Sequence, residues 1–143
     1  MSGRVFCAAA LTCGAASGAP LRLDEPFSFW GGLDPATGRI VDRWRPQRGA
    51  NVAGRVLMMP AGRGSCSGSA ALAEAIRAGV GPAAILLLDR DSIVVVGAMV
   101  AAELYGRECP VVLVREEDWD RLAAASWLTV EAGPGVATVI VEG

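Results

Sequence analysis

The sequence predicts a compact α/β domain with a β/β/α arrangement of its layers. One observation is a set of short, continuous apolar runs, which are typical of strands covered on both faces. A second is that segments with helical spacing of their apolar residues follow these runs. A third is that strand-like runs stand at both ends of the chain. The continuous apolar runs lie at 54–59, 83–88 and 110–114. The strand-like runs at the two ends lie at 4–11 and 127–141.

The first third of the chain is predicted to hold three strands, at 4–11, 20–24 and 39–43. The small residues at 14–18 predict a flexible turn between the first two strands. Asp34-Pro-Ala-Thr-Gly38 predicts a turn before the third strand, because Asp, Pro and Gly favour turn conformations. The polar, Arg-rich segment 44–53 predicts a surface loop.

The remainder predicts alternating strands and helices and then a hairpin. A helix at 69–78 is expected to stop at Gly79, and Asp89-Arg-Asp-Ser92 offers an N-cap for a helix ending at Gly106. Ile93-Val-Val-Val96 would also suit a strand. The acidic residues at 116–118 are interpreted as a charged helix turn rather than a metal site. The elements in order are strand 54–59, helix 69–78, strand 83–88, helix 93–105, strand 110–114, helix 116–125 and hairpin strands 127–131 and 136–141.

The composition excludes several kinds of chemistry and partner. The 143 residues, 1–143, fit one domain and include neither His nor Lys, so a His-activated serine, a His-ligated metal and a Schiff base are impossible within this chain. A net charge of -2 without a basic stripe argues against nucleic acid as a partner. No apolar run has the length of a membrane span. The start resembles a short signal peptide, but Thr12 and Gly14 interrupt it, so we expect a cytoplasmic protein.

The four cysteines match neither a zinc site nor an iron–sulfur pattern. Cys7, Cys13 and Cys109 are expected to be small buried hydrophobic residues. Cys66 differs because it lies in a Gly/Ser-rich loop.

That loop, residues 59–69, lies between a predicted strand and a predicted helix and is the main candidate for a functional site. It lacks the Lys of a phosphate-binding loop. It also lacks the first glycine of a hydrolase elbow, and no histidine is present to activate a serine there. Two interpretations remain open: a simple connection with a good N-cap, and a serine that transfers a proton.

Ser65 is placed to be such a proton-transfer group. Backbone N–H donors, the positive end of the helix and the guanidinium of Arg63 could together stabilise its alkoxide. This environment suits removal of a proton next to a carboxylate, provided that something else, typically a metal, assists the leaving hydroxide. Because the chain offers no convincing metal site, the hypothesis predicts a partner.

A second candidate is Trp30-Gly31-Gly32, where glycines would let a ligand approach the backbone and Trp would supply apolar area. The alternative, which the residues alone favour, is a hairpin with a buried aromatic.

Four segments together resemble the small subunit, or swivel domain, of the aconitase X family. They are Pro26-Phe-Ser-Phe-Trp-Gly-Gly-Leu-Asp-Pro-Ala-Thr-Gly-Arg-Ile-Val-Asp42, Gly54-Arg-Val-Leu57, Pro60-Ala-Gly-Arg-Gly-Ser-Cys-Ser-Gly-Ser69 and Val100-Ala-Ala-Glu-Leu-Tyr-Gly106. The resemblance covers residues 4–142. It implies a β/β/α swivelling domain similar to the aconitase swivel domain, and pairing with a larger subunit that carries iron or an iron–sulfur cluster.

The resemblance also implies residue roles. It places the catalytic base on Ser65, and the substrate-binding loop on Arg63, Gly64, Cys66 and Ser67. It further suggests that one wall of the substrate site is formed by Phe29, Trp30, Gly31 and Gly32.

The activity implied is that of a hydro-lyase acting on a small hydroxy acid. Family members dehydrate cis-3-hydroxy-L-proline or mevalonate 5-phosphate, and an Arg-only, Ala-rich composition, suggestive of a GC-rich bacterial genome, favours the first. The competing class is a non-catalytic swivelling or interaction domain, in which Ser65 could be changed without consequence. The phosphohistidine form of such a domain is excluded because the chain has no His.

Overall fold

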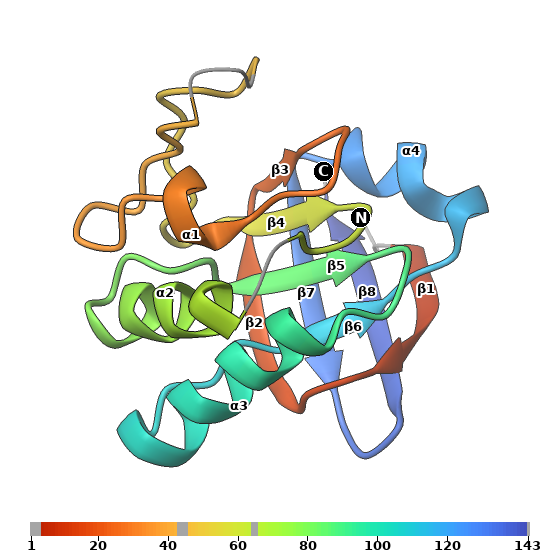
Figure 1. Ribbon diagram of the computed structural model, residues 1–143. Coiled ribbons are helices and arrows are strands. Elements are labelled where there is room, and N and C mark those ends of the chain that lie inside the picture. The colour runs from red at the N-terminus through yellow and green to blue at the C-terminus, as the bar shows by residue number, and fades with distance from the viewer. Residues whose placement is uncertain (1–3, 43–45, 64–65, 143) are drawn as a thin grey trace.

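The protein is described from a computed structural model, which covers residues 4–42, 46–63 and 66–142 (Figure 1). Eight strands form one sheet in the order β2-β7-β8-β1-β6-β5-β4-β3. The strands are β1 (Arg4–Ala10), β2 (Gly14–Gly18), β3 (Pro20–Arg22), β4 (Val56–Met59), β5 (Ala84–Leu87), β6 (Val111–Leu113), β7 (Trp127–Ala132) and β8 (Val136–Glu142). The helices are α1 (Phe29–Gly32), α2 (Cys66–Arg77), α3 (Ser92–Tyr105), the 3₁₀ turn η1 (Glu116–Asp118) and α4 (Trp119–Ala123).

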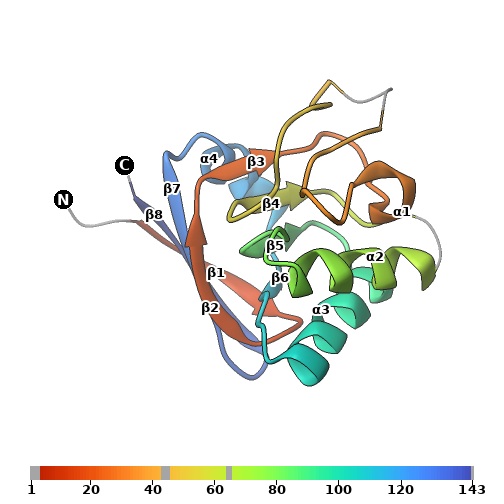
Figure 2. The ribbon, with the colours of Figure 1, turned by 90° about the vertical axis from the view of Figure 1, so that its left-hand side faces the viewer.

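The sheet has a parallel half and an antiparallel half. Strands β3, β4, β5 and β6 pair in parallel, whereas β1, β8, β7 and β2 pair antiparallel, and β1 joins β6 antiparallel. The two edge strands, β2 and β3, are separated in the chain only by Ala19. The sheet therefore curls until its two edges approach each other, giving the strongly curved outline in Figure 2.

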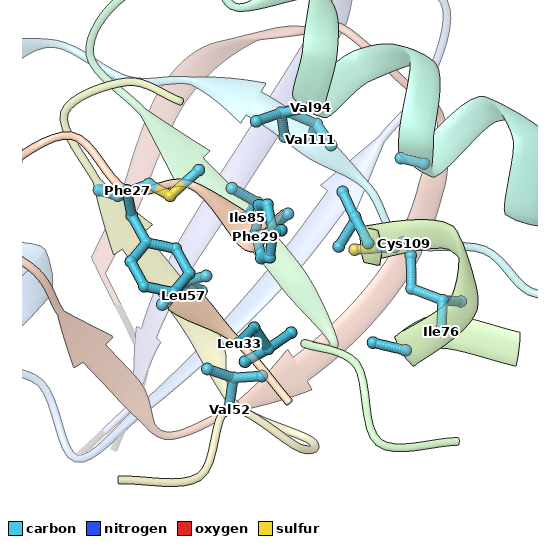
Figure 3. Close-up of a cluster of buried hydrophobic side chains, with 14 of the residues drawn as sticks. Phe27, Phe29, Leu33, Val52, Leu57, Ile76, Ile85, Val94, Cys109 and Val111 are labelled. Carbon is cyan, nitrogen blue, oxygen red and sulfur yellow. The ribbon is translucent and has the colours of Figure 1, made fainter. Parts of the chain in front are cut away.

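Two hydrophobic clusters lie on the two faces of the parallel strands. Along β4, Leu57 and Met59 face the cluster under α2 and α3, and Val56 and Met58 face the cluster inside the curved sheet. Figure 3 shows the helix-side cluster, where Phe27 and Phe29 lie with Leu57 and Ile85. Burial on both faces explains why these strands are continuous apolar runs in the sequence.

The structure confirms the predicted elements from 54 to 141, with small shifts of boundary. The segment 89–92, predicted to offer the N-cap of α3, does so through Asp91, whose carboxylate accepts a hydrogen bond from the Val94 backbone N–H at 3.0 Å. The predicted stop is Gly106, in the left-handed conformation with φ 64°. The alternative of a strand at 93–96 is wrong, since this β-branched run is helical. The helix expected at 116–125 is divided into η1 and α4.

Two predictions in the first third of the chain are wrong. Residues 14–18 form strand β2, not a turn, because their backbone pairs with β7 along its whole length. The strand expected at 39–43 is not formed in its described part. Only isolated bridges occur there, Leu33 with Ile40 and Arg39 with Asn51. The predicted turn before it is confirmed, with the Gly38 N–H donating to Asp34 O at 2.8 Å.

The cysteine prediction is confirmed only for Cys109, which is buried. Cys7 and Cys13 are exposed. Cys7 lies on the outward side of β1, next to Phe6, which points into the cluster inside the curved sheet. Among the described residues, no helix is long and apolar enough to cross a membrane.

Candidate functional site

The candidate loop follows β4 and meets the segments that follow the two neighbouring parallel strands. Because β3, β4 and β5 are parallel, their carboxyl ends lie at one edge of the sheet. Residues 23–28, 60–63 and 88–91 therefore emerge together. In open parallel sheets such an edge is where ligands commonly bind.

Backbone hydrogen bonds tie the loop after β4 to the segment after β3. The Phe27 N–H donates to Ala61 O at 3.2 Å, and the Arg63 N–H donates to Phe27 O at 3.0 Å. Phe27 is fully buried, and its ring makes an edge-to-face pair with that of Phe29 at a centroid distance of 5.3 Å. The aromatic motif around Trp30 is thus anchored beside the Gly/Ser-rich loop.

The same loop rests on the segment after β5 through Gly62. A side chain at Gly62 would place its Cβ 2.7 Å from the carboxyl carbon of Asp91. Asp91 in turn caps α3 through Val94. Glycine at position 62 is therefore required by close approach, because any larger residue would displace the capping carboxylate.

Gly64 and the predicted base Ser65 lie outside the described residues. Their neighbours on both sides are described: Arg63 is exposed, and Cys66 and Ser67 are exposed at the start of α2. The predicted order of strand, loop and helix N-terminus is confirmed by these neighbours. The role of Ser65 stays a prediction.

A hollow of about 550 Å³ joins the two segments that the sequence singled out separately. From the aromatic segment, Phe29, Trp30 and Gly31 line it, and from α2, Ser67 does. Trp30 is 67% exposed, so it forms an open wall of the hollow rather than the buried aromatic of the favoured hairpin interpretation. The described lining also includes Leu33, Pro35, Ala70, Ala71 and Glu74.

Three predicted residues are not part of this described lining. Gly32 is buried under the Phe27 ring, where an added Cβ would lie 2.9 Å from Phe27 Cε1. Its role is to allow that packing. Arg63 is exposed, and Cys66 lines a second hollow of about 450 Å³ beside α3.

Glu74 is a lining residue that sequence reasoning missed. It follows Ser67, Ala70 and Ala71 at the spacing of one helix face, and this stripe of small residues was a readable signal. Arg77 donates side-chain hydrogen bonds to its carboxylate, which lowers the pKa of Glu74. The carboxylate is therefore held in its charged form at the edge of the hollow.

The described residues do not fit an iron centre. Among them, no group of three or more His, Cys, Asp or Glu side chains is placed to hold a metal ion. Cys109 is buried, and burial raises the pKa of its thiol to about 12, which opposes formation of the thiolate that metals bind.

Comparison with known proteins gives a consistent result. A sequence model described as the aconitase X swivel domain matches residues 5–139. The chain is 46% identical over 123 residues to the cis-3-hydroxy-L-proline dehydratase of Pseudomonas aeruginosa, covering 86% of this chain and 21% of that protein. It is 37% identical to the phosphomevalonate dehydratase small subunit of Archaeoglobus fulgidus, covering 94% of this chain and 98% of that subunit.

Among solved structures, a chain of the holo form of Thermococcus kodakaraensis aconitase X matches with a TM-score of 0.80 at 28% identity, over 99% of this chain and 100% of that chain. The solution structure of a UPF0107 protein matches with a TM-score of 0.81 at 34% identity, over 98% of this chain and 100% of that one. The present chain spans about a fifth of the length of the first curated relatives that it matches.

Proposed function

Since the chain belongs to the aconitase X swivel domain family, we propose that it acts as the small subunit of a hydro-lyase that dehydrates a small hydroxy acid. One observation carries this proposal: the segment 29–31 and the first turns of α2, distant in sequence, meet at one hollow directly after the candidate loop. The hollow is open, so a second body is required to exclude water from a reacting substrate. That body is proposed to be a large subunit or the corresponding part of a longer chain.

The proposed substrate is cis-3-hydroxy-L-proline. Two relatives named as dehydratases of this compound are 46% and 40% identical to the chain. The one charged side chain in the described lining of the hollow, Glu74, is paired with Arg77, so the proposed substrate rests on these relatives and not on the charge of the hollow.

Phosphomevalonate is the second candidate. Small subunits named for its dehydration match this chain over nearly their whole length, as in Archaeoglobus fulgidus, with 98% of that subunit covered. Their identity to this chain is lower, 37% in that case.

Ser65 is proposed to take the proton next to the substrate carboxylate. Helix α2 has no acidic residue in its first turn, so the backbone N–H groups and positive end of the helix are available to stabilise a negative oxygen. Arg63, exposed in the same loop, can add a positive charge. The iron implied by the family is assigned to the partner, because the described residues here offer no ligand group.

The test is turnover by the complex of this chain co-expressed with the large subunit from the same organism. We expect dehydration of cis-3-hydroxy-L-proline and a loss of kcat of at least about 100-fold in Ser65→Ala, which is the usual contribution of a general base. Ser17→Ala is the matched control, since it makes the same substitution at an exposed serine of β2 that does not line the hollow. It should retain activity.

Two results would count against the proposal. Equal kcat in Ser65→Ala and the wild type would refute the base and favour a non-catalytic domain. Turnover of mevalonate 5-phosphate instead of hydroxyproline would keep the hydro-lyase and the base but replace the substrate.

A further inference from the structure

Helix α3 is apolar on two opposite faces. Its inner face, Val94, Gly97, Ala98 and Ala101, is buried against the helix-side core. Its outer face is defined here as Val96, Met99, Val100 and Glu103, which share the opposite side of the helix by the same spacing. Glu103 is the one charged residue of α3. Val96 is 46% exposed and Met99 is 56% exposed. A helix that is apolar nearly all round is normally covered on all sides.

Hollows flank the outer face on both sides. One of about 780 Å³ lies between α3 and the turn after β1, and its lining includes Leu11, Cys13, Val96, Met99 and Val100, together with Glu103 and Glu108. The other, of about 450 Å³, lies between α3 and the start of α2. Val96 and Val100 line both, so they form an apolar ridge between two depressions.

The ridge is continuous with the candidate site. The hollow on the α2 side is lined by Cys66, Ser69 and Ala70 from α2, and by Ile93, Val96 and Val100 from α3. Cys66 is the residue directly after Ser65. A body that seated on the outer face of α3 would therefore also lie over the start of α2.

We infer that the outer face of α3 is the surface on which the larger part of the dehydratase docks, and that this contact places that part over the loop after β4. The inference rests on the proposed function. Its occupant is indicated by the relatives themselves: in the dehydratases 46% and 40% identical to it, this domain makes up 21% of a longer protein, so four fifths of the chain is available to cover such a face.

The surface also defines the chemistry of its partner. Between Val96 and Val100 it offers only apolar side chains, and toward the C-terminal end of α3 it offers the carboxylate of Glu103. The matching surface is an apolar patch with a basic group at one end. Because the apolar contacts are central, association should weaken only slightly as the salt concentration rises.

The experiment measures association of this chain with its co-expressed large subunit by size exclusion and by the Kd of the purified complex. Val96→Glu and Met99→Glu, singly and together, place a charge in the contact without reducing helix propensity. We expect the Kd of the double variant to be at least about 30-fold higher than that of the wild type. Val96→Ile and Met99→Leu, which keep the surface apolar, should assemble normally.

Val5→Glu is the matched control. It makes the same substitution at a valine of β1 that is 60% exposed and lines neither hollow. Circular dichroism of each variant checks that the fold is retained. Ser65→Ala separates this inference from the proposed function, since it should abolish turnover and leave Kd unchanged.

Three results would contradict the docking surface on α3. Normal assembly of the double variant overturns the docking surface, whatever the activity of Ser65→Ala. Equal weakening by Val5→Glu overturns it as well, because the effect would then not be specific to α3. A self-association of this chain that the double variant removes would assign the face to a second copy and also overturn the inference.

Discussion

Gly62 shows how one missing side chain positions the candidate loop. Its backbone lies against the carboxylate of Asp91, and that carboxylate caps α3. The sequence predicts the cap, because Asp is a strong N-cap residue before a helical pattern. It does not predict the contact with Gly62, because Gly62 follows β4 whereas Asp91 follows β5, so the two residues are distant in the sequence.

This contact leads to a prediction of coupled stability. Gly62→Ala should cost about 1 kcal/mol, because the added methyl displaces the capping carboxylate, and Asp91→Ala should cost a similar amount. In the double variant the added methyl has no carboxylate to displace. The loss of unfolding free energy in the double variant should therefore be well below the sum of the losses in the two single variants. Urea unfolding of the two single variants and the double variant measures this.

The control is Gly133→Ala, in the β7–β8 turn, where an added Cβ would have no neighbour nearer than 3.9 Å. It should leave the free energy of unfolding nearly unchanged. Strict additivity in the double variant would show that Gly62 and Asp91 do not interact.

At the scale of elements, the close crossing of α2 and α3 depends on Gly97. An added Cβ there would lie 2.9 Å from Ser69 O and 3.1 Å from Leu72 Cδ2. Ser69 also donates from its hydroxyl to Ile93 O at 2.6 Å, which ties the starts of the two helices together. The crossing therefore fixes where the outer face of α3 lies relative to the candidate loop.

We expect Gly97→Ala to destabilise the protein by about 1–3 kcal/mol, although alanine is the better helix former, because a backbone carbonyl cannot move aside as a side chain can. Gly68→Ala is the matched control in α2. Its Cβ would meet only the Ile93 methyl, at 3.2 Å.

Thermal unfolding distinguishes the two variants. The melting temperature of Gly97→Ala should fall by several degrees more than that of Gly68→Ala. An equal or smaller fall would mean that the helix crossing adjusts without cost.

At the scale of the whole molecule, the joint between β2 and β3 connects the two edges of the curved sheet. Arg55 donates from Nε to Ala19 O at 3.1 Å and from a terminal nitrogen to Pro20 O at 2.7 Å. Gly18 packs so closely on Gly54 O that an added Cβ has no room there. Both sheet edges are thus held by contacts between residues that are far apart in the sequence.

Gly18→Ala should therefore cost about 3 kcal/mol, at the upper end of typical overpacking, because the methyl would collide with a backbone carbonyl. Ser17→Ala, an exposed change at the adjacent position, is the control and should be nearly neutral. The free energies of unfolding in urea test this. A neutral Gly18→Ala would show that the joint is looser than its geometry indicates.

The resemblance drawn from the sequence motifs is confirmed by the family match over residues 5–139 and by similar solved structures. The sequence by itself determined what depends on neighbours along the chain: the strands buried on both faces, the caps at Asp91 and Gly106, and the Gly/Ser-rich loop before α2. The absence of His and Lys likewise excluded whole classes of chemistry.

Tertiary structure decided what depends on distant partners. Residues 14–18 are a strand because β7 pairs with them, and Cys7 is exposed because β1 turns Phe6 inward instead. The hollow between Trp30 and Glu74 exists because α1 lies against α2. Local propensity is weak for such short, small-residue segments, so only long-range hydrogen bonds and packing select their conformation and bring them to one site.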